Sequence, residues 1–304
     1  MSSAPRAGHE ADAVIVTGSS SGLGLETALH LAERGFNVFA TVRDIESAPA
    51  VLKAAKERGV TLQVRQLDLG DRDGITAAVD KMAAEAGGLF GLVNNGGLGL
   101  RGCLEDTTDE EIRRVFEANV FGTMAVTKAV LPHLRRGGRG RIITITSIGG
   151  RISSFGVSVY CSTKFAQEGM AEGLALEVAP FGIQAVIIEP GIIKTSRWSV
   201  NRGTAVGAHD PASPYHGMFE ASETVADKLV NRSKTTSEDV ARAVHEALTA
   251  AKPRLRYVVG RPASVVLRMR RLLPDPWFEK MYWGPFVRQI TRKGRPRTAA
   301  QAGR

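Results

Sequence analysis

Tyr160 and Lys164 stand four positions apart in a segment whose apolar spacing predicts a helix over 157–178. That separation puts both side chains on one face of the helix, about one turn apart. A tyrosine with an ordinary pKa of about 10 is protonated at neutral pH, and an ammonium beside it favours ionisation. Such a pair could exchange a proton with a substrate oxygen, although ordinary amphipathic helices contain the same spacing.

Ser147 and Asn119 are the other polar residues at positions where chemistry is expected. Ser147 follows the predicted strand 141–146, at the carboxyl edge of the sheet, and its hydroxyl could bond the reacting oxygen. Asn119 falls within a predicted helix over 109–134, where Asn is unfavourable unless its side chain or a local distortion serves a purpose, such as a relay through water. The alternatives are a strand-end cap for Ser147 and a tolerated surface residue for Asn119.

The elements that must position these residues alternate along the chain from residue 13. Short apolar, β-branched runs are separated by longer amphipathic segments, which is typical of repeated β-α units that build a parallel sheet. We therefore predict an α/β protein with a Rossmann-type, doubly wound parallel sheet of about seven strands and helices on both faces. The predicted strands are 13–17, 37–42, 61–67, 89–94, 141–146, 184–189 and 256–259. The predicted helices are 23–34, 71–86, 109–134, 157–178 and 237–250.

The 304 residues are expected to form one domain over 13–260, preceded by a flexible N-terminus at 1–12. Residues 192–235 break the β-α alternation, because they are rich in Gly, Pro, Ser and His, and they are long enough to form a mobile substrate lid. A basic and aromatic extension follows at 261–304. It could lie on a membrane surface, close over the pocket or, as the simplest interpretation, pack on a partner subunit.

A glycine-rich turn joins the first predicted strand to the first predicted helix. Its glycines permit a tight turn and a close approach of the backbone to a pyrophosphate, which the positive end of the helix then holds. Glycine-rich loops are common, but this position between a strand and a helix favours a dinucleotide site. The residues of the turn assigned to the cofactor are Thr17, Gly18, Ser20, Ser21, Gly22, Leu23 and Gly24.

The end of the second predicted strand bears on the choice between NAD and NADP. An enzyme that uses NAD places an acidic side chain there, against the adenosine ribose. The Arg43 guanidinium could instead pair with a 2′-phosphate, aided by the Ser21 hydroxyl. We therefore predict a preference for NADP, with NAD as the other possibility. The alternative is that Arg43 is a surface residue and Asp44 bonds the ribose.

The spacing of these glycines resembles the T-G-x-x-x-G-x-G pattern of the short-chain dehydrogenase/reductase family, and matching motifs extend over 14–195. Asn119, Ser147, Tyr160 and Lys164 coincide with the catalytic tetrad of that family. The resemblance implies that Tyr160 transfers a proton, that Lys164 lowers its pKa and binds the nicotinamide ribose, and that Ser147 orients the substrate. It also implies that Asn119 holds a water chain that reaches Lys164.

Further segments complete the cofactor site that the resemblance implies. A loop after the fourth strand departs from the family's N-N-A-G motif by having Gly96 in place of alanine. A segment after the sixth strand is similar to the P-G-x-x-x-T motif that lies along the nicotinamide, although it could be a plain turn. The residues assigned to the cofactor in these segments are Asp68, Leu69, Asn95, Gly96, Gly97, Pro190, Gly191, Ile193 and Thr195, together with Tyr160 and Lys164.

A narrower similarity concerns the subgroup of 17β-hydroxysteroid and retinol dehydrogenases. It is carried by the sequence around Tyr160 and by residues 252–257 and 267–270. It implies a flat, apolar alcohol or ketone such as a steroid, for example the pair estradiol and estrone. The alternatives are retinol or a broad range of carbonyl compounds. The expected substrate contacts are Leu98, Ser147, Phe155, Val157 and Tyr160.

Composition limits the partners. The net charge is +9, but no basic and aromatic array of a nucleic-acid module is present, so we expect no nucleic-acid partner. Two cysteines are too few for a disulfide scaffold or a thiolate metal site, which favours a reducing, cytoplasmic setting without a bound metal. No signal peptide and no run of about 18 apolar residues is evident, so membrane contact is expected at most through the extension.

Two expectations concern assembly and the class of function. The resemblance implies a homodimer or homotetramer built on the helices that contain Asn119 and Tyr160. A competing function of a different class is a catalytically silent NADP-binding regulator that senses redox state. The presence of both Tyr160 and Lys164 argues against it, because a sensor needs neither.

Overall fold

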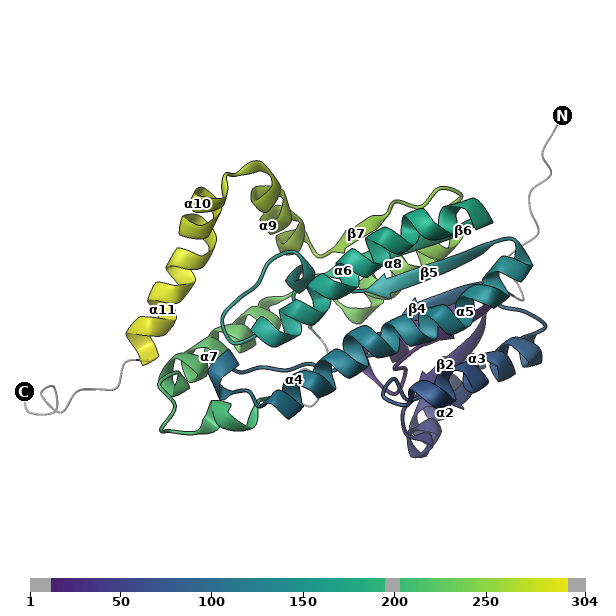
Figure 1. Cartoon of the computed structure of the whole chain (residues 1–304), viewed down its shortest axis with the longest axis horizontal. Coiled ribbons are helices and arrows are strands. Elements are labelled where there is room, and N and C mark those ends of the chain that lie inside the picture. Colours follow the sequence, from purple (N-terminus) through teal and green to yellow (C-terminus); the bar gives the residue numbers. More distant parts are fainter. Residues whose placement is uncertain (1–11, 195–202, 295–304) are drawn as a thin grey trace, which may run out of the picture.

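The computed structural model describes residues 12–194 and 203–294, which contain a seven-stranded sheet between two layers of helices (Figure 1). The sheet has the strand order β3-β2-β1-β4-β5-β6-β7, and every pairing is parallel. The strands are β1 (Ala13–Val16), β2 (Asn37–Val42), β3 (Gln63–Gln66), β4 (Gly91–Asn94), β5 (Gly140–Ile145), β6 (Ile183–Pro190) and β7 (Arg256–Val259). The order reverses between β1 and β4, which creates the switch point where open α/β sheets bind ligands. The predicted doubly wound sheet is confirmed.

The helices cover both faces of this sheet because successive strand residues point to opposite sides. Val14 and Val16 pack in one hydrophobic cluster with residues of α1, α2 and α8, whereas Ile15 packs in another with residues of α3, α5 and α6. The helices that precede the catalytic segment are α1 (Gly22–Glu33), α2 (Ala48–Glu57), α3 (Arg72–Ala86), α4 (Asp109–Phe116) and α5 (Thr123–Gly137). The later ones are α6 (Ser158–Val178), α7 (His216–Arg232), α8 (Ser237–Thr249), α9 (Arg261–Leu272), α10 (Asp275–Phe278) and α11 (Gly284–Gly294).

The long helix that the sequence predicts over 109–134 is divided. A π-helical segment, Glu117–Gly122, separates α4 from α5. This widened turn lies against the residues that follow β3, where a Cβ on Gly122 would come within 2.4 Å of the Leu69 carbonyl oxygen. Periodicity alone could not reveal this contact, because it joins residues far apart in the chain.

Five of the described helices were absent from the sequence prediction: α2, α7 and the three helices of the C-terminal extension, α9, α10 and α11. α2 is a short helix after a turn, and it buries only Val51 and Ala55. α7 lies in the Gly- and Pro-rich segment 192–235, which the sequence interpreted as an irregular lid. Phe219 of α7 is fully buried in a cluster with Leu100 and Val159, so this helix is held by tertiary packing.

α9 lies beside β7, and α10 and α11 continue from it to the end of the molecule that contains α7, away from α2 and α3 (Figure 1). α11 packs against α7, and Phe278 at the end of α10 is fully buried. Among the described helices, none combines the length and the apolar character needed to cross a bilayer. The extension is therefore folded onto the domain through these contacts.

Candidate active site

Four polar side chains meet at one cavity at the carboxyl edge of the sheet. The cavity has a volume of about 460 Å³ and is bounded by the ends of β5 and β6 and by the first turns of α6. Ser147 reaches it from the end of β5, and Tyr160 and Lys164 reach it from α6. Asn119 reaches it from the π-helical segment. The four residues that the sequence assigns to catalysis therefore share a single cavity.

Tyr160 is partly exposed on the cavity wall. The surrounding protein raises the pKa of Tyr160 to about 12, chiefly because a buried phenolate would lose its hydration. The neighbouring Cys161 thiol acts in the same direction on this pKa, and a hydrogen bond with the Ser147 hydroxyl acts in the opposite direction. The phenol is therefore protonated at neutral pH.

Lys164 is buried beside Tyr160, with its Nζ 5.8 Å from the centre of the tyrosine ring. Burial lowers the pKa of Lys164 to about 8, and the Glu168 carboxylate acts in the opposite direction. The Lys164 Nζ donates to the Ile145 carbonyl at 3.1 Å and to Gln167 Oε1 at 2.8 Å. The sequence predicted that the ammonium lowers the pKa of the phenol. In this structure the pKa of the phenol is raised instead, chiefly by burial.

Asn119 is fully buried, and its side chain fixes the loop that follows β4. Oδ1 accepts from the Leu98 N–H at 2.6 Å, while Nδ2 donates to the Leu98 carbonyl at 2.9 Å and to Thr163 Oγ1 at 3.0 Å. The main-chain carbonyl of Asn119 accepts from Gln167 Nε2 at 2.6 Å. A helix distortion is thus present, as the sequence suggested. The group bonded to this carbonyl is a side chain, where the family resemblance implies water.

A larger cleft of about 800 Å³ adjoins the cavity along the carboxyl ends of β1 and β4. It is lined by most of the residues that the sequence assigns to the cofactor. These are Gly18, Ser20, Ser21, Gly22, Leu23, Gly24, Arg43, Asp68, Leu69, Asn95, Gly96 and Gly97. The residues shared by the cleft and the cavity are Leu23, Asn95, Gly97, Leu98 and Gly99. A ligand in the cleft can therefore reach a substrate in the cavity.

The remaining residues assigned to the cofactor lie behind the cleft or beside the cavity. Thr17 Oγ1 accepts from the N–H groups of Asn95 and Gly96 at 3.0 and 2.9 Å, so Thr17 fixes the loop after β4 from behind. Three further residues assigned to the cofactor line the substrate cavity and not the cleft: Pro190, Gly191 and Ile193. Thr195 lies outside the described residues.

The start of α1 is shaped for a pyrophosphate. Gly18 has a φ of +68°, and a Cβ on Gly24 would lie 2.2 Å from the Gly18 carbonyl oxygen, so the turn has room only for glycine. The Ser21 side chain caps no N–H of α1, and the first turn contains no acidic residue. Backbone N–H groups and the helix dipole at such an end attract anions. The cleft therefore fits the phosphate groups of a nicotinamide dinucleotide.

Arg43 and Asp44, between which the sequence leaves the cofactor choice open, both line this cleft. Arg43 Nε lies 3.0 Å from Asp44 Oδ2, and the two side chains are 63% and 57% exposed. An exposed ion pair of this kind contributes little to stability. Either side chain can therefore exchange its partner for a ligand group.

The walls of the substrate cavity are largely apolar. Of the residues predicted to contact the substrate, Leu98 and Val157 line the cavity together with Ser147 and Tyr160. Phe155 is not part of this lining and instead packs against the neighbouring hydrophobic cluster around α7. Its side chain therefore supports the wall from outside.

Tyr282 is a wall residue that the sequence analysis missed. It follows α10 in a short π-helical segment, and the buried Phe278 ring stacks on it with centroids 5.2 Å apart. The adjacent Trp283 Nε1 donates to the Ser153 carbonyl at 2.9 Å, which ties the extension to the cavity rim. The extension thus contributes to the pocket, the second of the three alternatives. The aromatic residues of 277–283 were a signal, but they do not indicate which surface they cover.

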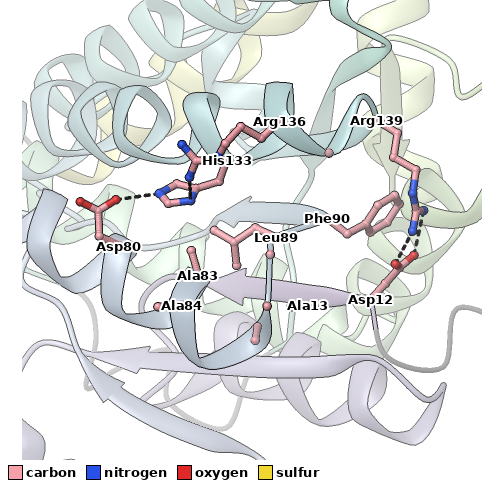
Figure 2. Close-up of a pocket in the computed structure, with 14 residues that line it drawn as sticks. Asp12, Ala13, Asp80, Ala83, Ala84, Leu89, Phe90, His133, Arg136 and Arg139 are labelled. Carbon is pink, nitrogen blue, oxygen red and sulfur yellow. Dashed lines mark hydrogen bonds and ion pairs between the residues drawn. The ribbon is translucent and has the colours of Figure 1, made fainter.

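A further cavity of about 780 Å³ lies at the amino edge of the sheet (Figure 2). Its charged side chains pair with one another: Arg139 bonds Asp12 at 2.5 Å, and His133 Nε2 lies 2.7 Å from Asp80. Arg136 lies 2.6 Å from the other ring nitrogen of His133. None of the residues assigned to catalysis lines this cavity. The candidate chemistry therefore belongs to the carboxyl edge.

Comparisons with known proteins agree with this geometry. The family model described as short chain dehydrogenase matches residues 12–204. Human 17-beta-hydroxysteroid dehydrogenase type 1 is 34% identical over 271 residues, covering 86% of this chain and 81% of that protein. The crystal structure of a short-chain dehydrogenase from Streptomyces avermitilis has a TM-score of 0.74 at 32% identity, covering 91% of this chain and 97% of the other. A variant of actinorhodin polyketide ketoreductase, solved with NADPH, has a TM-score of 0.71 at 28% identity, covering 84% and 97%.

Proposed function

Because this chain belongs to the short-chain dehydrogenase/reductase family, we propose that it interconverts a secondary alcohol and a ketone on an apolar substrate, with a preference for NADP(H). The observation that carries the proposal is the meeting of Ser147, Tyr160 and Lys164 in an apolar cavity that opens onto a glycine-lined cleft. This arrangement supports proton transfer to a substrate oxygen beside a bound dinucleotide.

Tyr160 is the proposed proton-transfer group. Its raised pKa keeps the phenol protonated at neutral pH, which is the form that donates to a ketone oxygen during reduction. The Ser147 hydroxyl, already bonded to the phenol, would hold the same substrate oxygen. The bound cofactor supplies or accepts the hydride. Lys164 would bind the nicotinamide ribose and, in its charged form, favour the phenolate that alcohol oxidation needs.

The preference for NADP rests on Arg43. Its guanidinium lines the cleft and is held only by an exposed partner, so it is free to pair with a 2′-phosphate once Asp44 is displaced. The ketoreductase relative solved with NADPH is consistent with this assignment. A nicotinamide cofactor itself is common to the family.

A steroid is the proposed substrate, by analogy with the human relative. A cavity lined by Leu98, Val157 and Tyr282 suits a flat apolar compound. The polyketide ketoreductase has the same fold at 28% identity. One fold can serve different carbonyl substrates. Retinol and simple aryl ketones are therefore the alternatives. Of the lid expected over 192–235, Ile192 and Ile193 line the cavity, and residues 195–202 lie outside the described part of the chain.

The decisive experiment follows NADPH fluorescence across a panel of estrone, other steroids, retinal and aryl ketones. Replacing Tyr160 by Phe should reduce turnover by about 10²- to 10⁴-fold while leaving the dissociation constant for NADPH unchanged. Undiminished turnover by Tyr160→Phe would refute the assigned chemistry. NADPH binding without turnover of any compound would instead favour the non-catalytic regulator.

We also propose that the protein is a homodimer or homotetramer. Its interface would be formed by α6, which contains Tyr160, and by the helices α4 and α5 on either side of Asn119. The exposed apolar side chains there include Phe165 and Leu176, the latter 78% exposed. An apolar surface of this kind is usually buried in an assembly. Leu176→Arg should lower the mass measured by light scattering, and an unchanged mass would exclude this surface as the interface.

A further inference from the structure

Gln167 is a buried residue of α6 that joins two members of the proposed catalytic tetrad. Its Oε1 accepts from Lys164 Nζ at 2.8 Å. Its Nε2 donates to the Asn119 carbonyl at 2.6 Å and to Thr123 Oγ1 at 3.2 Å. Both ends of the carboxamide are thus engaged.

The partners of Gln167 determine how the carboxamide is oriented. Rotating it by half a turn would place N–H donors against an ammonium and an oxygen against a carbonyl. Both contacts would be repulsive. The oxygen of Gln167 must therefore face Lys164, and the donor must face the π-helical segment.

The ammonium of Lys164 is held by neutral acceptors, the Ile145 carbonyl and Gln167. The nearest acidic group is Glu168 on the same helix, but Arg256 Nε lies 3.1 Å from its carboxylate. Glu189 of β6, which raises the pKa of no described group at this site, is itself bonded by Arg151 at 2.9 Å. The other titratable neighbour of Lys164 is Tyr160, whose ring centre lies 5.8 Å from Nζ. Among the described residues, Gln167 is thus one of two acceptors that bond the ammonium directly.

We propose that Gln167 is a positioning residue, which fixes Lys164 at the cavity wall by bridging it to the Asn119 carbonyl. This inference rests on the proposed function and deepens it. Its basis is the pair of hydrogen bonds by which the Gln167 carboxamide joins Lys164 Nζ to the Asn119 carbonyl.

The test compares Gln167→Leu with Gln167→Glu. Leucine has a similar size but no acceptor, so the pKa of Lys164 should fall and the alkaline limb of the pH profile should move down by about one pH unit. We expect kcat to fall by about tenfold at the same time. Glutamate keeps an oxygen toward Lys164, so its alkaline limb should stay at the wild-type pH or move above it.

Thr123→Val is the matched control. It removes the second acceptor of the Gln167 amide and leaves the contact with Lys164 intact. Its pH profile and kcat should match those of the wild type. NMR titration of ¹⁵N-labelled lysine side chains in the protein without cofactor gives the pKa of Lys164 directly, with Lys164→Met identifying the signal.

The inference is overturned when the lysine signal and the alkaline limb of Gln167→Leu coincide with those of Thr123→Val, or when the leucine and glutamate variants shift in the same direction. The NMR titration needs no turnover, so it remains informative even for a variant of low activity. Absence of turnover in the wild type would instead count against the proposed function.

Discussion

Burial acts on Tyr160 and Lys164 in the same sense, because it favours the neutral form of each side chain. The phenol is a stronger candidate for donating a proton than for accepting one, and the amine is close to losing its charge near neutral pH. At the scale of single residues, a protonated phenol is the form that the proposed donation to a ketone oxygen requires.

Arg43→Ala tests the cofactor preference. Loss of a charge-assisted bond to a 2′-phosphate should raise the Michaelis constant for NADPH by about 10- to 100-fold, and the constant for NADH should hardly change. Steady-state kinetics with each cofactor measures both constants. Asp44→Ala is the control. It frees Arg43 from its ion pair, so it should not raise the Michaelis constant for NADPH. Equal effects on the two cofactors would contradict the role of Arg43.

Helix periodicity predicted that Tyr160 and Lys164 share one face, and a strand end predicted Ser147 at the ligand-binding edge; in the structure all three line one cavity. The sequence could not reveal Gln167, whose partner in the π-helical segment is 48 residues away. Tyr282 was hidden for the same reason, since only the folded chain brings it to the cavity. Local spacing thus identifies the reacting groups, and long-range packing determines what supports and encloses them.

At the scale of elements, the junction between α4 and α5 depends on Gly122. A methyl group there would meet the backbone of Leu69, which cannot move away as a flexible side chain could. Gly122→Ala should therefore destabilise the protein by about 1–3 kcal/mol. Because Leu69 lines the cofactor cleft, NADPH affinity should fall as well.

Gly173→Ala provides the contrast, since a Cβ on this residue of α6 meets no atom within 4 Å. Replacing a helical glycine by alanine at an open position should raise the free energy of unfolding of the protein by about 0.5–1 kcal/mol. Urea unfolding of the two variants gives both values. Equal stability of Gly122→Ala and Gly173→Ala would show that the close approach to Leu69 is not a constraint.

The packing of α1 on α8 should make stability depend on pH. His30 is buried between these helices with its ring centre 5.8 Å from that of His245, and burial lowers the pKa of His30 below its ordinary value of 6.5. The folded state therefore keeps His30 neutral, whereas the unfolded chain takes up a proton below pH 6.5. This contribution to stability is complete above pH 6.5 and is lost as the pH falls.

The urea midpoint should accordingly be lower at pH 5 than at pH 7.5, and His30→Gln should reduce this difference. The comparison between wild type and variant removes the contributions of other titrating groups. A pH dependence that is identical in both proteins would show that His30 does not contribute to it.

The strands of this protein were easier to predict from the sequence than its helices. All seven strands were predicted; the central strands have apolar runs buried on both faces, whereas the edge strand β3 is polar and only partly buried. α7 was missed because its segment is rich in residues that usually form loops, and the burial of Phe219 against Leu100 and Val159 overrides that preference. The sequence suggested a local distortion at Asn119 but predicted one continuous helix over 109–134, because a π-helical turn has no distinctive periodicity.

At the scale of the whole molecule, the C-terminal helices complete a wall of the substrate cavity through Tyr282. Tyr282→Ala should remove apolar contact area and reduce kcat/KM for large apolar ketones by about 10- to 100-fold, without affecting the Michaelis constant for NADPH. Trp277→Ala is the control, since this aromatic residue of α10 is 66% exposed. A change of equal size in Trp277→Ala would mean that Tyr282 acts through the stability of the extension.

Every described residue that lines the cofactor cleft precedes position 204, whereas Tyr282 comes from the last helices. The proposed coenzyme site is thus built before position 204, whereas one wall of the substrate cavity is added by the end of the chain. Grafting another relative's final helices onto this scaffold should retarget the catalyst while its coenzyme half remains untouched.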